Sequence, residues 1–131
     1  MRILIAEDDL ANRRFMQKFL SKYGECDIAV DGVETIDAFY AAMKEKKPYD
    51  LICLDIMMPR VDGLKALETI RKLETQNGVS KEERVKVIMT TALNDKQTVM
   101  GSYDAGCQAY AWKPINTSKF IEVMKKLTLI E

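Results

Sequence analysis

Short apolar runs alternate with longer amphipathic segments along the whole chain. The short runs are mostly continuous stretches of apolar residues, as expected of parallel strands that are buried on both faces. The longer segments repeat an apolar residue every three or four positions, which is the spacing of a helix with one buried face. The pattern predicts strands at residues 3–6, 27–30, 51–54, 85–89 and 109–112. It predicts helices at about residues 10–23, 32–47, 64–76, 95–103 and 117–127.

Local signals indicate where several of these helices begin and end. Gly24 follows the first helix where a C-cap is expected. Asn94–Asp95 can cap the fourth helix, and Asn116 or Thr117 can cap the last. Residues 78–84 are polar and charged, which predicts an exposed loop or an extra helical turn. The apolar face of the first helix is expected to contain Phe15, Phe19, Leu20 and Tyr23.

Five strands that alternate with five helices predict a doubly wound α/β fold. The sheet should be parallel and covered by helices on both faces, with right-handed crossover connections. The 131 residues contain no internal repeat, low-complexity segment or interdomain linker. We therefore expect one domain over residues 1–131, with no output domain.

Charge and hydropathy exclude several classes of partner. Lys and Arg together number 20, as do Asp and Glu, so the formal net charge is zero. The chain as a whole should therefore not be attracted to nucleic acid or to an anionic membrane. No apolar stretch approaches the roughly 20 residues of a membrane span. Acidic residues from Glu7 onward come too early for a signal peptide, so we expect a cytoplasmic protein.

Cysteine and histidine usage limits the available chemistry. Cys26, Cys53 and Cys107 are widely spaced and odd in number, which makes small core residues the simplest interpretation. The chain has no histidine to complete a zinc site with them or to act as a general acid or base. The remaining chemistry belongs to carboxylates, lysine, hydroxyl groups and a hard cation.

Chemically active side chains follow four of the five predicted strands. The carboxyl ends of parallel strands lie along one edge of a sheet, where open α/β folds bind their ligands. Clustered carboxylates repel one another unless a cation compensates them, and oxygen ligands suit Mg²⁺. The residues are Glu7, Asp8 and Asp9 after the first strand, Asp55 after the third, Thr90 and Thr91 at the end of the fourth, and Lys113 after the fifth.

Each of these residues also has a structural interpretation. The acids at residues 7–9 could serve only the dipole of the next helix, and Thr91 could satisfy backbone groups. Asp55 and Lys113 could be ordinary turn residues. A site is favoured because the structural interpretation requires one sheet edge to collect all of them by chance.

The motifs closely resemble the response-regulator receiver domain of two-component signalling, the CheY-like superfamily. The resemblance covers essentially all 131 residues. It implies a flavodoxin-like (βα)₅ sandwich with the strand order 2-1-3-4-5. The matching segments are residues 3–9, Asp55 to Pro59 with Asp62–Gly63, residues 89–92, and residues 109–114.

The resemblance assigns roles to the residues at the sheet edge. Asp55 would accept a phosphoryl group from a phosphohistidine on a partner histidine kinase or phosphotransfer protein. Asp8 and Asp55 would bind Mg²⁺ directly, with Mn²⁺ as a substitute. Glu7 would bind the metal through water, and the backbone carbonyl of Met57 would be a further ligand. Lys113 would offset charge on the transferred oxygens.

The resemblance also implies a switch. Thr91 would hydrogen-bond the phosphoryl group, and Tyr110 would swing inward as the threonine moves. The face formed by the fourth helix, fifth strand and fifth helix would then bind a downstream protein. Trp112 lies two residues after Tyr110 in the predicted strand, so both side chains should point to the same side. Trp112 is either buried under the last helix or part of this face. The family further implies a cis peptide bond before Pro114.

The sequence departs from the common receiver pattern at three places. Glu7 stands where aspartate is common, and its longer arm should still reach a water on the metal. The segment between Asp55 and Thr91 is longer than usual, with the excess placed at residues 76–84, far from the acidic edge. Met57 and Leu93, at positions that in this family flank the approach of hydrolytic water, are both apolar. Our hypothesis is a long-lived phosphoryl-aspartate, with core packing as the alternative.

Other functions fit the sequence less well. A haloacid dehalogenase-type phosphatase needs a second aspartate at the position of Met57, and residues 7–9 would repel a phosphate-bearing cofactor. No Gly-x-x-x-x-Gly-Lys motif is present, so the phosphoryl group should come from a partner or a small donor. The protein should be a signalling phosphoacceptor rather than an enzyme with a separate substrate. The alternative is a phosphorylation-independent docking module, although such chains typically lack the acidic pair, the threonine or the lysine.

Overall fold

The computed structural model describes residues 1–131 and contains five strands, five helices and one short 3₁₀ turn. The strands are β1 (Arg2–Ala6), β2 (Glu25–Ala29), β3 (Leu51–Leu54), β4 (Lys86–Thr91) and β5 (Ala109–Trp112). The helices are α1 (Leu10–Leu20), α2 (Gly32–Lys44), α3 (Gly63–Gln76), α4 (Lys96–Asp104) and α5 (Thr117–Lys126). The 3₁₀ turn, η1, spans Lys81–Glu83 and precedes β4.

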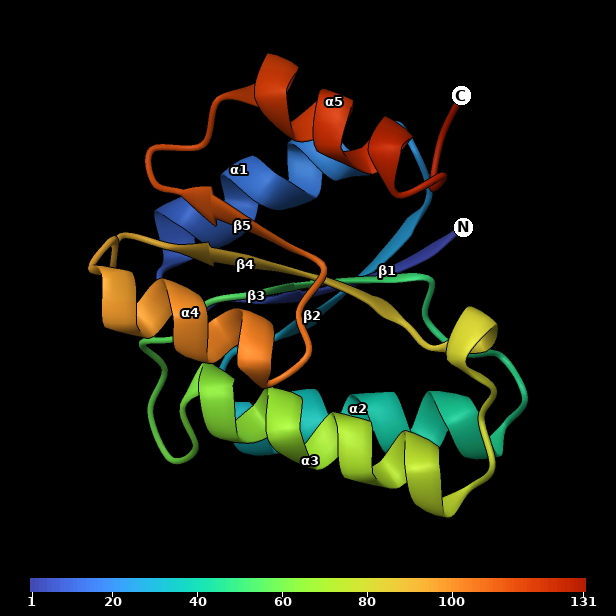
Figure 1. The fold of residues 1–131 in the computed structure, drawn as a ribbon. Helices are drawn as coiled ribbons and strands as arrows, with labels where there is room; N and C mark the ends of the chain where they lie inside the picture. Colours follow the sequence, from blue (N-terminus) through green and yellow to red (C-terminus); the bar gives the residue numbers. More distant parts are fainter.

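All five strands pair in parallel, in the order β2-β1-β3-β4-β5. Helices α1 and α5 cover one face of the sheet, and α2, α3 and α4 lie on the other (Figure 1). The fold is therefore the flavodoxin-like α/β sandwich that the sequence predicts. Because the strand order reverses between β1 and β3, the carboxyl ends of these two strands border the crevice where such sheets bind ligands.

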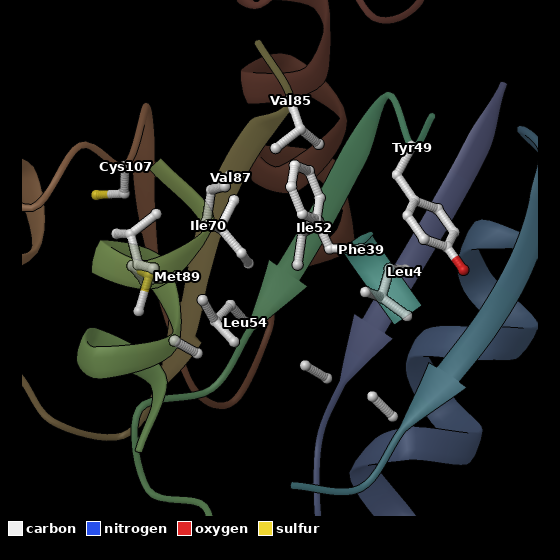
Figure 2. Packing of buried hydrophobic residues seen from close by; sticks show 14 of the residues in the cluster. Leu4, Phe39, Tyr49, Ile52, Leu54, Ile70, Val85, Val87, Met89 and Cys107 are labelled. Carbon is white, nitrogen blue, oxygen red and sulfur yellow. The ribbon is translucent and has the colours of Figure 1, made fainter. Parts of the chain in front are cut away.

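Two apolar cores hold the helices on the sheet. The larger core lies between the sheet and the α2–α3 layer, and Figure 2 shows Leu54, Ile70 and Met89 packed within it. The smaller core lies under α1 and α5 and includes Met16 and Phe120. Alternate residues of each central strand point into opposite cores, which explains why β1 and β3 are continuously apolar.

Helix N-termini follow the predicted caps. Asp95 accepts a hydrogen bond from the Thr98 N–H at 3.0 Å, and Asn116 accepts one from the Lys119 N–H at 3.0 Å. The two ambiguous caps are thereby resolved in favour of Asp95 and Asn116. The other N-caps are Asp9, Asp31 and Asp62.

Four predictions about the first forty residues are wrong. Helix α1 ends at Leu20 rather than at residue 23, and Phe15 is 44% exposed rather than part of the core. Gly24 is not a C-cap, because β2 begins directly after it. The chain needs glycine there since a Cβ would lie 2.3 Å from the Met1 carbonyl oxygen. Pairing with Arg2 of β1 therefore starts β2 at Glu25, two residues earlier than the apolar pattern suggests.

The long connection between α3 and β4 lies at the end of the sheet opposite the predicted site (Figure 1). Helix α3 runs to Gln76, and Gly78 then turns the chain with a φ of 69°. Of the two alternatives that the sequence predicts here, an exposed loop or an extra helical turn, the 3₁₀ turn η1 is the second. Strand β4 then extends to Thr91, two residues beyond its predicted end, because its last residues pair with Ala111 and Trp112.

Cysteine burial agrees with the core interpretation for two of the three residues. Cys53 and Cys107 are buried, Cys26 is half-buried, and all three are free thiols. None of the helices has both the length and the apolar character that crossing a bilayer would require.

Candidate functional site

The sheet ladder places the predicted site residues just beyond the strand ends. The Glu7 N–H donates to the Ala29 carbonyl at 3.0 Å, and the Asp55 N–H donates to the Ala6 carbonyl at 3.1 Å. On the other side of the crevice, the Lys113 N–H donates to the Thr91 carbonyl at 3.0 Å. The side chains of Glu7, Asp55 and Lys113 therefore start from backbone positions held by hydrogen bonds to neighbouring strands.

Three carboxylates meet at this edge. One oxygen from each of Glu7, Asp8 and Asp55 lies within 4.8 Å of the others. Glu7 and Asp55 are only 2% and 5% exposed, whereas Asp8 faces solvent. Three like charges at this separation, two of them buried, repel one another strongly unless cations compensate them.

Lys113 supplies a positive charge that compensates part of the charge of these carboxylates. Its Nζ donates hydrogen bonds to Glu7 Oε1 and, at 2.9 Å, to Asp55 Oδ2. The second oxygen of Glu7 accepts the Asp9 N–H at 3.1 Å, and the second oxygen of Asp55 accepts the Met57 N–H at 3.3 Å. The Asp8 carboxylate accepts no hydrogen bond and is free to bind a ligand.

The pKa shifts follow from this arrangement. Burial raises the pKa of Glu7, and Asp55 adds to the effect, against the lowering influence of Lys113 and of the Asp9 N–H. Burial alone would lower the pKa of Lys113, but its hydrogen bonds to Glu7 and Asp55 reverse the direction and raise it. Lys113 therefore stays protonated at neutral pH and carries one positive charge against three carboxylates.

The donor set fits a hard divalent cation. All the candidate ligand atoms are carboxylate oxygens, which Mg²⁺ prefers, and no thiol or imidazole is among them. Asp8 supplies a carboxylate that accepts no hydrogen bond, and one of its oxygens lies within 4.8 Å of one from Asp55. The Met57 carbonyl accepts no hydrogen bond either, so its oxygen is available for the predicted role as a metal ligand.

Thr91 and Tyr110 are connected through the backbone of one residue. The Leu93 N–H donates to the hydroxyl of the fully buried Thr91 at a long 3.4 Å, while the Leu93 carbonyl accepts a hydrogen bond from the Tyr110 hydroxyl. Burial raises the pKa of Tyr110 to about 12, with Asp95, Cys107 and Asp55 adding to the shift, so this hydroxyl remains a donor. Leu93 therefore links the two predicted switch residues.

Met57 and Trp112 are exposed side chains. Met57 is 62% exposed, which excludes core packing as the explanation of its apolar character, whereas Leu93 is half-buried. Trp112 is 50% exposed, so the interpretation that α5 buries it is wrong. Its ring lies 5.5 Å from that of Tyr110, which confirms that both point to the same side of β5. The Lys113–Pro114 peptide bond is cis, as predicted.

Asp9 and Arg13 support the acidic loop through contacts that the sequence does not predict. Asp9 caps α1 through its side chain and also donates its N–H to Glu7. Arg13, one turn into α1, donates to the backbone carbonyls of Glu7 and Asp8 at 3.2 and 3.4 Å. The N-cap pattern could have identified Asp9, but no sequence signal separates Arg13 from the adjacent Arg14.

Comparison with known families agrees with this geometry. The model of the response regulator receiver domain matches residues 3–125. The chain belongs to the response-regulator receiver family. It is therefore a receiver domain of two-component signalling, a signalling phosphoacceptor rather than a classical enzyme, and it has an acidic triad that fits Mg²⁺.

The sequence relatives include proteins much larger than this chain. The peroxide stress-activated histidine kinase mak2 of Schizosaccharomyces pombe is 33% identical over 98% of this chain, which covers 5% of that kinase. The chain spans only 5–12% of the length of its histidine kinase relatives.

Two solved structures are similar over nearly the whole chain. One is the receiver domain of the sensor histidine kinase PA1611 from Pseudomonas aeruginosa, with magnesium in its active-site cleft. It is 25% identical, with a TM-score of 0.77 and coverage of 95% of this chain and 94% of that one. The other is the receiver of Ssk1, crystallised with the phosphotransfer protein Ypd1 of Saccharomyces cerevisiae. It shares the fold at 24% identity and a TM-score of 0.82, with coverage of 99% and 92%.

We expect Mg²⁺ to stabilise the protein because only the folded chain brings the three carboxylates together. Free Mg²⁺ at ten times its Kd should raise the free energy of unfolding by about 1.4 kcal/mol. Asp8→Asn removes the free carboxylate and should abolish most of this gain. Urea denaturation with and without Mg²⁺ measures both effects, with Asp50→Asn, at the opposite end of the sheet, as the control. Equal gains in Asp8→Asn and wild type would contradict this assignment.

Proposed function

We propose that this receiver accepts a phosphoryl group on Asp55 in the presence of Mg²⁺ and passes the change to a protein-binding face. The observation that carries the proposal is the burial of Asp55 between two further carboxylates and one lysine at the crevice of the sheet. A simple turn residue needs neither the buried acids nor the cation. An aspartate nucleophile needs both, because catalysis of phosphoryl transfer is mainly positioning and charge compensation.

The proposed reaction moves the phosphoryl group from a histidine nitrogen of the donor to a carboxylate oxygen of Asp55. The P–O bond forms as the P–N bond breaks, and the histidine keeps the electron pair of the broken bond. Lys113 already donates to Asp55 Oδ2 and can donate to a phosphoryl oxygen placed there. The Met57 N–H holds the other carboxylate oxygen. Mg²⁺, bound by Asp8 and Asp55 directly and by Glu7 through water, would supply further positive charge.

The proposed switch uses the link through Leu93. The bond between the Leu93 N–H and Thr91 is long, so the Thr91 hydroxyl can exchange it for a phosphoryl oxygen at little cost. That movement displaces the Leu93 backbone, whose carbonyl holds the Tyr110 hydroxyl. Tyr110 in turn lies against Trp112, so the change reaches the surface at β5.

The proposed output face consists of α4, β5 and α5. Met100, Tyr103 and Trp112 are 54%, 48% and 50% exposed on it, a density of large apolar groups that suits a protein interface. The partners proposed are a histidine kinase or phosphotransfer protein as donor and a downstream protein on this face. The pairing of the Ssk1 receiver with Ypd1 supports that class of donor. A cytoplasmic location stays a prediction.

Incubation with Mg²⁺ and a small acyl phosphate, followed by intact-mass measurement, tests the proposal. Wild type should gain the mass of one phosphoryl group and Asp55→Asn should gain none, because the amide lacks the nucleophilic oxygen. Asp62→Asn is the control, since asparagine preserves that helix cap. The fluorescence of Trp112, the only tryptophan, should change with phosphorylation. An equal gain of mass in Asp55→Asn, or none in wild type, would refute the proposal. The phosphorylation-independent docking module would then be the remaining interpretation.

We further propose that the phosphoryl group on Asp55 is long-lived, since neither Met57 nor Leu93 can orient a hydrolytic water. The double substitution Met57→Asn and Leu93→Glu should shorten the half-life of the phosphorylated protein about tenfold, because both new side chains hydrogen-bond water. The decay of the phosphorylated mass after removal of the donor measures this. Met100→Gln, at another exposed methionine, on α4, is the control. An unchanged half-life in the double variant would count against the idea.

A further inference from the structure

A buried ion pair on α3 reaches the loop that follows α4. Arg71 and Glu74 lie one turn apart on the inward face of α3, with side chains 13% and 2% exposed, and their closest atoms are 2.7 Å apart. They occupy the opposite end of the sheet from Asp55. The phosphoacceptor site makes no use of them.

Arg71 makes five hydrogen bonds, a number equal to its N–H donors. The Nε and Nη2 groups donate to the Gly106 carbonyl at 3.1 and 2.8 Å, and Nη2 also donates to Gln108 Oε1 at 3.0 Å. The Nη1 group donates to Glu74 and, at 3.0 Å, to the Val85 carbonyl. One guanidinium group therefore joins α3, the start of β4 and the α4–β5 loop.

The partners of Arg71 are themselves held in place. Glu74 accepts the Val85 N–H at 2.8 Å, and Gln108 Oε1 accepts the Val87 N–H at 2.7 Å. Gly106, with a φ of 108°, lies so close that a Cβ there would be 3.1 Å from Arg71 Nε. A buried, fully bonded fork of this kind is costly to disrupt because every freed group would lose its partner.

The amino-terminal part of α4 is attached much more weakly. Residues 94–101 form hydrogen bonds only within the segment 94–105, and Ser102 is the sole buried residue of the helix. The helix has nine residues, includes Gly101 in its interior, and would be marginal in isolation. Before it, Leu93 packs against the larger core and forms hydrogen bonds only with Thr91 and Tyr110, the residues of the proposed switch.

We propose that Arg71 anchors the carboxyl end of α4 and the α4–β5 loop, so that within residues 92–108 phosphorylation moves only the loop and first turns at residues 92–100. The inference rests on the proposed function and adds the part of the output face that responds. A clamped carboxyl end makes α4 pivot rather than shift as a whole. Tyr103 then belongs to the constant part of the partner surface, whereas Met100 and the switch residue Tyr110 belong to the changing part.

Amide hydrogen exchange of the full chain tests the anchor in the resting state. Arg71→Lys keeps a charge opposite Glu74 but loses the fork to Gly106, Gln108 and Val85. Exchange at residues 104–108 should accelerate about tenfold or more, while exchange in β1 and β3 stays unchanged. Lys72→Ala, the exposed neighbour on α3, is the matched control. Gln108→Ala keeps the Arg71–Glu74 pair and should accelerate the same residues to a smaller extent.

The same measurement with Mg²⁺ and an acyl phosphate tests the pivot. Wild type should change its exchange at residues 92–100 but not at 104–108, and Arg71→Lys should change at both. Equal changes at both segments in wild type, or an unaltered 104–108 in resting Arg71→Lys, would overturn the inference. A wild type that takes up no phosphoryl mass would instead refute the proposed function, while the resting-state comparison would still decide whether Arg71 is an anchor.

Discussion

Lys113→Met should lower the rate of phosphorylation by a small acyl phosphate about 10²–10³-fold. In enzymes, a fixed hydrogen-bond donor that faces developing charge contributes to the rate on this scale. Lys113 fits that description because its Nζ lies 2.9 Å from Asp55 Oδ2 and its backbone is bonded to Thr91. Methionine keeps a comparable length and apolar stem but offers no hydrogen bond or charge.

The same substitution should strengthen Mg²⁺ binding. Lys113 occupies one oxygen of Glu7 and one of Asp55, so a metal ion has to compete with it for the acidic cluster. Removal of the competing charge should lower the Kd for Mg²⁺ about tenfold, or about 1.4 kcal/mol. Rate and affinity are thus expected to change in opposite directions, which a general loss of structure cannot produce.

Stopped-flow phosphorylation and calorimetric Mg²⁺ titration measure the two effects. Lys119→Met, which removes an exposed lysine of α5, should leave both values near those of wild type. A Lys113→Met rate within threefold of wild type would show that the lysine only neutralises the resting site.

Gly63→Ala should both destabilise the protein and slow its phosphorylation. A Cβ at Gly63 would lie 2.1 Å from the carbonyl oxygen of Asp55 and 2.8 Å from the Ile56 Cα. Both neighbours are backbone atoms in the rigid turn after β3, so the chain itself has to move. Overpacking of this kind costs about 1–3 kcal/mol. The shift falls on the proposed nucleophile, where a displacement of about 1 Å can cost 10²-fold in rate.

Urea denaturation and the acyl phosphate assay measure these losses, and Gly101→Ala is the matched control. Gly101 also lies within a helix, but no atom outside its own helix lies within 4 Å of a Cβ there. Alanine should therefore raise the free energy of unfolding by about 0.5–1 kcal/mol. If Gly63→Ala had the stability of wild type, the turn after β3 would have to accommodate a Cβ without strain, and the prediction would be wrong.

The candidate site could be predicted almost completely because its residues follow directly from strand ends. A buried strand has a recognisable apolar run, and the next residue must lie at the sheet edge. Glu7, Asp55 and Lys113 were identified in this way. The resemblance to receivers then ordered the strands, which the alternating pattern leaves open.

Errors occurred where partners distant in sequence decide the outcome. The early start of β2 depends on pairing with Arg2 of β1, and the exposure of Phe15 and Trp112 depends on how much surface the helices cover. Helical spacing alone does not distinguish a core aromatic from one at the rim of the core.

Apolar periodicity and strand-end chemistry are local properties, so the order of elements and the acidic edge were already contained in the amino-acid sequence. Lys113 hydrogen-bonds to Glu7, 106 positions away in the sequence, and to Asp55, 58 positions away. Arg71 likewise reaches from α3 to Gly106. These contacts depend on distances in space. No local pattern encodes such distances, because they arise only when the packed sheet brings these segments together.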